Sequence, residues 1–326
     1  MTSIDFLAGF TIFILGLIVV AAMVPGLLIG IQSSEIDYDA VAYRTAVILV
    51  EDPGWPLYPQ SWELYGSSHA HEVVRMGLAV SKDTPNILLS TKVDRFFNET
   101  IFSPEDYREK VIFGDYPYSY NITLNYLSLG EQNRSIGDPR PDGYGYIRRV
   151  VLIKEPSWTE INETHVDDAG DLRLLKVRLN FSELLDLSMK PAYRIDPRIE
   201  PVTITITDFN KYLIDASEPA TLKDVRFYRG DTLIPFGYNQ VDPEKYQFTI
   251  DDESNLTLET HEVSQNISLI LQPGALPLDE NSILNVVFNF TEEGAQKTKI
   301  NGTHIYDYGN ATRPDLVPAV LEVAIW

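Results

Sequence analysis

The hydrophobic pattern changes along the chain, and its longest apolar stretch comes first. From Phe6 to Ile31 no residue is charged, and the first lysine or arginine is Arg44. A helix over these 26 residues would be about 39 Å long, which exceeds the roughly 30 Å hydrocarbon core of a bilayer. A secretory signal peptide has a basic start and a shorter apolar core, so it fits poorly. The pattern therefore predicts a retained membrane helix.

A helical rhythm continues beyond this apolar stretch. In residues 32–50 apolar side chains recur every three or four positions, at Ile36, Ala40, Tyr43, Val47 and Val50. The prolines of "EDPGWPLYP" then end the helix, because proline lacks the N–H that helical hydrogen bonding requires. We therefore expect residues 1–50 to form one long hydrophobic helix that serves for membrane insertion and assembly.

A mixed pattern of helix and strand follows in residues 51–168. The stretch "SPEDYREKVIFG" has a helix start at Ser103, with Pro104 in the first position and acidic residues in the first turn. The stretches "YSYNITLNYLSL" and "GYIRRVVLIKE" alternate polar and apolar residues, as strands do. These elements predict an α+β head in which a helix packs on an antiparallel sheet.

Residues 169–326 contain many short strand patterns and little helix. Eight alternating stretches, from "DLRLLKVRLNF" to "VPAVLEVAIW", recur at spacings of roughly ten to twenty residues, with turn residues between them. Such spacing is typical of two packed sheets, so we expect an all-β immunoglobulin-like sandwich, with "SWTEINETHVDDAGD" as the linker before it. The predicted fold class is α+β: a long N-terminal helix, an α/β head and a sandwich.

Composition narrows the classes of function. The net charge of -21 disfavours a nucleic-acid partner, because phosphates would repel the chain. Cysteine is absent, which excludes disulfides, thiolate catalysis and cysteine-ligated metals. Domains of this size that are secreted by bacteria or eukaryotes often use disulfides. The absence of cysteine therefore favours an archaeal surface protein.

The asparagines indicate where the chain resides. Ten of the 16 asparagines begin an Asn-x-Ser/Thr sequon, whereas random placement gives about two, because Ser and Thr make up about an eighth of the chain. The Thr-rich composition of strands would raise that number without reaching ten. We expect N-glycosylation, and therefore an extracellular location for everything after residue 90. The ten sites are Asn98, Asn121, Asn133, Asn162, Asn180, Asn255, Asn266, Asn289, Asn301 and Asn310.

Motifs for catalysis are not found in the sequence. It contains no nucleophile elbow, zinc-protease motif, phosphate loop or dinucleotide fingerprint, so we expect no enzyme activity, no catalytic residue and no cofactor. Three clusters could hold a metal, but each is more simply a polar surface turn, and neither acidic cluster has the spacing of a dedicated Ca²⁺ loop. They are His69, His71 and Glu72; Asp167, Asp168 and Asp171; and Asp251, Asp252 and Glu253.

The first residues carry a resemblance to a known family. "MTSIDFLAGFTIFILGLIVVAAMVP" resembles the mature start of type IV pilins, and in particular of archaeal pilin-like (pseudopilin) surface proteins. Met1, Thr2, Ile4, Asp5, Phe6 and Pro25 match that pattern. The resemblance implies a pilin-like head and a role for Asp5 in neutralising the amine of Met1 of a neighbouring subunit. The basic leader of prepilins is not found in this sequence.

Other residues of the apolar stretch suit close packing of helices. Gly26 and Gly30 form a G-x-x-x-G step, which lets two helices approach closely. Pro25 interrupts the helical hydrogen bonds near the outer end. Asp5 either lies in the headgroup layer or pairs with a cation when helices bundle. Met1, Asp5, Pro25, Gly26 and Gly30 are therefore the expected assembly residues.

Together these patterns predict a structural surface protein. We expect a subunit or minor component of an archaeal type IV pilus-like filament, with copies of itself, other pilin-like subunits and the membrane as partners. The alternative is a solitary membrane-anchored glycoprotein that binds the surface layer or an adhesion partner. In both hypotheses the amino end lies at the membrane and the glycosylated bulk lies outside the cell.

Overall fold

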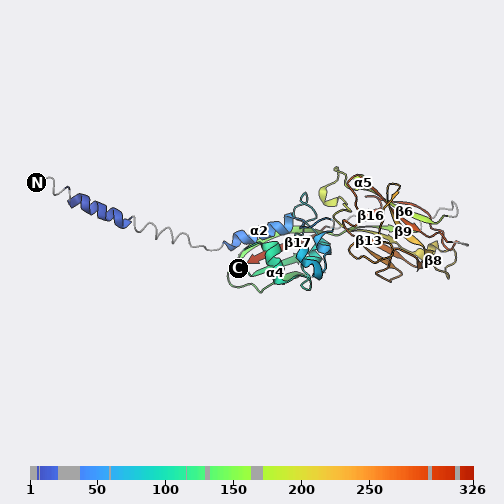
Figure 1. The fold of residues 1–326 in the computed structure, drawn as a ribbon, viewed down its shortest axis with the longest axis horizontal. Coiled ribbons are helices and arrows are strands. Elements are labelled where there is room, and N and C mark those ends of the chain that lie inside the picture. Colours follow the sequence, from blue (N-terminus) through green and yellow to red (C-terminus); the bar gives the residue numbers. More distant parts are fainter. Residues whose placement is uncertain are drawn as a thin grey trace. The chain divides into compact units, whose positions relative to one another are not determined.

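The computed structural model describes residues 6, 8–20, 37–58, 60–114, 116–128, 133–162, 172–292, 296–312 and 316–326 (Figure 1). The chain divides into two compact units, residues 1–38 and residues 39–326. In the first unit residues 8–20 are helical, and most of their large apolar side chains are exposed: Ile12 is 71% exposed and Phe13 is 64% exposed.

The expectation of one long hydrophobic helix over residues 1–50 is wrong. The described residues there form two separate helical stretches, residues 8–20 and helix α2 (Tyr38–Glu51). No helix among the described residues is both long enough and apolar enough to cross a membrane. The expected assembly residues Met1, Asp5, Pro25, Gly26 and Gly30 lie outside the described residues.

Helix α2 is a core helix of the second unit, which explains its apolar rhythm. It buries Val41, Ala42, Thr45, Ala46, Leu49 and Val50. The expected buried side is only partly correct, since Tyr43 is 55% exposed and lies under the guanidinium of Arg149, 5.2 Å from the ring centroid. The helix ends at Glu51, ahead of Pro53, as the sequence predicts.

The head consists of residues 39–154 and 316–326 and is built on a five-stranded sheet. Its strand order is β1-β4-β17-β2-β3, and only the β1–β4 pair is parallel. The strands are β1 (Ile87–Leu89), β4 (Gly145–Lys154), β17 (Leu316–Ile325), β2 (Tyr120–Tyr126) and β3 (Arg134–Gly137). The predicted strands β2 and β4 are confirmed.

Short helices complete the head. They are η1 (Trp62–Leu64), η2 (Ser67–Glu72), α3 (Ser90–Phe96), α4 (Pro104–Tyr107) and the π-helical turn η3 (Arg108–Ile112). The predicted helix start is confirmed: Ser103 and Asp106 form a reciprocal capping box, with Pro104 in the first turn. The backbone N–H of Ser103 donates to Asp106 Oδ2 over 2.8 Å.

The sandwich, residues 157–312, contains two five-stranded sheets. The first has the order β10-β9-β14-β6-β15, and the second has the order β11-β13-β7-β5-β16. The first consists of β10 (Thr232–Leu233), β9 (Asp224–Arg229), β14 (Ile283–Asn289), β6 (Leu174–Asn180) and β15 (Gly302–Tyr306). The second consists of β11 (Tyr246–Ile250), β13 (Ile267–Leu271), β7 (Val202–Ile206), β5 (Ser157–Ile161) and β16 (Ala311–Thr312).

Smaller elements fill the ends of the sandwich. They are a two-stranded sheet of β12 (His261–Val263) and β8 (Ala220–Leu222), helix α5 (Phe181–Leu184), and the turns η4 (Pro191–Tyr193) and η5 (Phe209–Tyr212). Alternate residues of the strands are buried, and they join one hydrophobic cluster between the sheets that includes Phe227, Phe248 and Phe288. A β-rich sandwich is therefore present, as predicted.

The immunoglobulin-like description needs correction. Both sheets of an immunoglobulin-like sandwich are antiparallel. In this sandwich β5 runs parallel to β7, and β6 runs parallel to β15. The head likewise differs from a simple helix on an antiparallel sheet, because β1 is parallel to β4 and only short helices accompany α2. The α+β fold class with a long hydrophobic helix is replaced by a mostly β architecture.

The connections between the two regions also differ from the expected boundaries at 51–168 and 169–326. The expected linker begins with β5, which is a strand of the sandwich. The final strand β17 follows the sandwich in the sequence but belongs to the head (Figure 1). It lies between β4 and β2 in the middle of the head sheet. The sandwich is thus inserted into the head between β4 and β17.

Candidate functional site: the domain junction and the sequons

A cavity of about 570 Å³ lies where the head meets the sandwich. The turn at residues 80–84 lines it from the head, and residues 182–200 with Glu280 and Asn281 line it from the sandwich. The segment 182–200 is held there because β6 ends at Asn180 and β7 begins at Val202, so the intervening chain must cross this end of the sandwich.

A buried ion pair links the two regions at this cavity. Lys154, the last residue of β4, donates from Nζ to Glu200 Oε1 over 2.8 Å, and each side chain is 1% exposed. The Lys154 ammonium also donates to the Arg194 carbonyl over 2.7 Å, while the Asp196 N–H donates to Glu200 Oε1 over 2.8 Å. Burial raises the pKa of the Glu200 carboxyl, and the neighbouring Lys154 charge opposes that rise.

Two further contacts anchor the start of the sandwich. The Ser90 hydroxyl of the head donates to Glu155 Oε2 over 2.7 Å, directly beyond β4. In β5, Ser157 Oγ and Tyr306 Oη share a buried hydrogen bond of 2.7 Å, which joins the two sheets. Burial raises the pKa of Tyr306, so its hydroxyl stays neutral. The connection from the head to the sandwich, residues 155–157, is therefore held by one hydrogen bond to the head and one within the sandwich.

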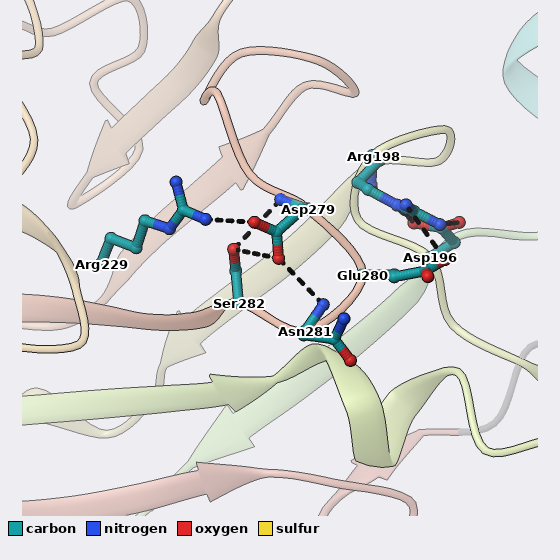
Figure 2. Close-up of polar contacts among 7 residues, drawn as sticks. All are labelled: Asp196, Arg198, Arg229, Asp279, Glu280, Asn281 and Ser282. Atoms are coloured by element: carbon teal, nitrogen blue, oxygen red, sulfur yellow. Dashed lines mark hydrogen bonds and ion pairs between the residues drawn. The ribbon is translucent and has the colours of Figure 1, made fainter.

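Arginine–carboxylate pairs lie on the sandwich side of the cavity and in the turn next to it (Figure 2). Arg198 makes two hydrogen bonds of 2.8 Å to the carboxylate of Asp196, and its Nη1 lies 4.0 Å from Glu280. Arg229 pairs with Asp279 in the adjacent turn. Arg198 thus lies between Asp196 of its own segment and Glu280 of the neighbouring turn.

The turn beside these pairs is ordered by one carboxylate. Asp279 Oδ1 accepts from the N–H of Asn281 and from the Ser282 hydroxyl, each over 3.0 Å (Figure 2). These bonds, with the Arg229 charge as a smaller contribution, hold the pKa of Asp279 below its usual range. The lining of the cavity, within the described part of the chain, contains no histidine and no lysine.

The sequon asparagines differ in exposure. Asn98, Asn133, Asn162, Asn255 and Asn310 are exposed, and Asn180, Asn266, Asn289 and Asn301 are partly exposed. All nine lie in loops or at the ends of elements. Asn121 alone is buried, at 9% exposure, inside β2.

Sequence comparison gives one archaeal relative. An uncharacterized protein of Archaeoglobus fulgidus is 30% identical to this chain over 171 residues, which cover 49% of this chain and 86% of the relative. This chain belongs to the same family. No family model matches the sequence, and no solved structure matches the fold.

The three clusters considered for metals are placed as follows. His69 and His71 lie on η2, exposed, with ring centroids 6.4 Å apart. The Asp251 carboxylate accepts from three successive backbone N–H groups at residues 264–266. Asp167, Asp168 and Asp171 lie outside the described residues. Throughout the described ranges, no three metal-ligating side chains converge.

The junction residues were missed by sequence reasoning. Lys154 looks like an ordinary polar position at the end of an alternating strand, and Glu200 lies 46 residues further along the chain. The one local signal is the charge-rich run "RIDPRIE", which contains Arg194, Asp196, Arg198 and Glu200 between two strands. That run indicates a polar turn but gives no indication of its partner.

Proposed function

We propose that this protein is a glycosylated structural component of an archaeal cell surface, as a subunit or minor component of a pilus-like filament. The apolar N-terminal segment holds it to copies of itself at the membrane, and residues 39–326 lie outside the cell. One observation carries the proposal: nine of the ten sequon asparagines are at least partly exposed and lie in loops or at element ends. Glycan acceptors need this placement.

The number of sequons argues against strand composition as their source. Because strands favour Thr, an Asn next to a strand often meets Thr, and this would raise the roughly two sequons expected by chance without reaching ten. The excess of sequons therefore supports selection for modification.

The N-terminal segment and the junction support a structural role. Most of the large apolar side chains between Phe6 and Val20 are exposed in the described residues, and an apolar surface of this extent needs a partner or lipid. The buried Lys154–Glu200 pair ties the head to the sandwich. A surface component needs such a tie, because it must hold its outer domain in a constant position.

A second candidate is the solitary membrane-anchored surface glycoprotein. The cavity of about 570 Å³ at the junction favours it, because a recess of this size suits a bound partner segment. Both candidates place the protein at the cell surface, and only the first assembles it into a filament.

Imaging distinguishes the two candidates. Immunogold labelling of native cells with an antibody against the sandwich, residues 157–312, should decorate regular fibres. Asp5→Ala should abolish the fibres and leave the protein in the membrane fraction, and Glu35→Ala provides a control acidic residue beyond the apolar stretch. Label restricted to the cell envelope in wild-type cells would favour the solitary anchor. Protein found in the cytosol, with its bare sequence mass, would exclude both candidates.

A further inference from the structure

The strand register of the second sheet places three sequons at one end of the sandwich. β5 begins at Ser157, next to the head, and ends at Ile161, so Asn162 lies at the far end. Ile161 pairs with Ile206, which pairs with Ile267, and Ile267 pairs with Ile250. The residues that flank these positions include Asn266, directly before β13, and Asn255, in the turn after β11. All three asparagines are therefore at the far end.

The first sheet places two more sequons at the same end. Tyr306, the last residue of β15, bonds to Ser157 at the near end, so the start of β15 lies at the far end. Asn301 directly precedes β15, and Asn289 pairs with Leu174 at the far end of β6.

A buried tyrosine joins the far ends of the two sheets. The Tyr212 hydroxyl donates to the Asn162 carbonyl. The Tyr212 carbonyl accepts from the Thr298 hydroxyl over 3.1 Å, three residues before Asn301. The two sets of sequons therefore belong to one end. Of the other sandwich sequons, Asn180 lies at the near end of β6 and Asn310 lies directly before β16.

Asn121 has a different role, because its side chain is part of the folded head. Its Nδ2 donates to Ser135 Oγ over 3.3 Å and to the Asp138 carbonyl over 3.1 Å. Its Oδ1 accepts from Thr123 Oγ1 over 3.0 Å and from Arg140 Nε over 2.9 Å. A glycan on Nδ2 would remove a donor from this network and would have to enter a site that is 9% exposed.

We infer that N-linked glycans form a cap on the far end of the sandwich, on Asn162, Asn255, Asn266, Asn289 and Asn301, and that Asn121 is a structural residue that remains unmodified. This inference rests on the proposed extracellular function. The burial and hydrogen bonds of each asparagine, rather than its sequon, decide which role it has. The cap covers the loops that contain the left-handed residues Asp251, Asp252 and Asn255. Exposed loop tips are preferred sites of proteolysis, so the glycans would shield them.

Glycopeptide mass spectrometry on the native protein tests the inference. We expect glycan on the five far-end asparagines and none on Asn121. Asn162→Gln should lower the intact mass by one glycan and leave the unfolding midpoint unchanged, because the Asn162 side chain is exposed. Asn121→Gln should leave the number of glycans unchanged and lower the unfolding midpoint by several degrees, because a buried hydrogen-bond network is lost.

The outcomes separate the inference from the proposed function. Glycan on Asn121 at an occupancy similar to that of Asn255 would overturn the inference and leave the extracellular location intact. Glycans confined to the head sites Asn98 and Asn133 would also overturn it. A protein without glycan at any sequon would overturn the proposed function itself. The wild-type glycopeptides decide the status of Asn121 even if Asn121→Gln fails to fold.

Discussion

The head and the sandwich are built in opposite ways from the same chain. The head needs two segments that are distant in sequence, residues 39–154 and 316–326, whereas the sandwich uses residues 157–312 without interruption. The head carries 12 Lys and Arg against 16 Asp and Glu and has three sequons. The sandwich carries 13 against 26 and has seven sequons. The excess of negative charge and the sequons are therefore concentrated in the inserted region.

The geometry of the insertion explains how both regions fold in one chain. Lys154, the last residue of β4, is the register partner of Leu316, the first residue of β17. The sandwich therefore leaves and rejoins the head at neighbouring positions, which is the condition that makes domain insertion tolerable. The comparison shows that the head sheet needs β17, the last strand in the sequence, whereas the sandwich is complete before that strand.

Removal of residues 316–326 should have the largest effect. β17 pairs with β4 along its length and with β2 over seven residues, so its loss separates the head sheet into two parts. We expect the head to lose cooperative folding while the sandwich persists. Hydrogen exchange measured by mass spectrometry should show lost protection in β2 and β4 and retained protection in β7 and β13.

The converse deletion provides the control. Replacing residues 157–312 with a short Gly/Ser linker should leave a folded head, because the linker joins positions that already lie side by side. Retained protection of β4 in the chain that lacks residues 316–326 would contradict the dependence of the head on β17.

Breaking the buried ion pair should have the next largest effect. Lys154→Met leaves Glu200 buried without its counter-charge, which typically costs about 3–5 kcal/mol. Denaturant unfolding should report this loss of stability. Lys154→Met combined with Glu200→Leu should recover much of it, because neither charge of this pair then remains buried without its partner. A single variant as stable as the wild type would show that the junction does not depend on this pair.

A smaller effect is expected at the far end of the sandwich. Asp251→Asn places an amide NH₂ against backbone N–H groups that now donate to carboxylate oxygens, including Ser264 N over 2.6 Å. Losing hydrogen bonds to a charged group typically costs about 1.5–3 kcal/mol. The exposed neighbour Asp252 is the matched control, and Asp252→Asn should change the unfolding midpoint little. Added Ca²⁺ should stabilise neither variant nor the wild type, because the Asp251 oxygens are occupied.

The smallest expected effect is the pH dependence that Asp106 contributes in the head. Burial raises the pKa of Asp106, but hydrogen bonds from Lys110 and Ser103 outweigh burial and hold that pKa below its ordinary value. The resulting stabilisation is present above the unfolded pKa of about 3.9 and is lost as the pH falls through the lower folded pKa. Asp106→Asn should remove this part of the slope in urea midpoints measured between pH 5 and pH 3. An unchanged slope would indicate that the capping box contributes no pH dependence.

Local elements were predictable because their signals are local. The alternation in "YSYNITLNYLSL" and "GYIRRVVLIKE" predicted β2 and β4, and Ser103 followed by Pro104 and acidic residues predicted a helix start. The long N-terminal helix was predicted incorrectly, because a shared helical period does not show that two stretches form one helix. α2 owes its apolar positions to the core of the head.

The sequence by itself determined the alternation of the strands, the helix start at Ser103, the ten sequons and the absence of cysteine chemistry. Only the tertiary structure decided that β17 belongs to the head, that Lys154 meets Glu200, and that Asn121 is buried while Asn255 is exposed. The reason is physical. Alternating apolar residues indicate which face of a strand is buried, and this signal lies within the strand's own sequence. The strands with which it pairs depend on the packing of segments that are far apart in the chain, so no single segment predicts them.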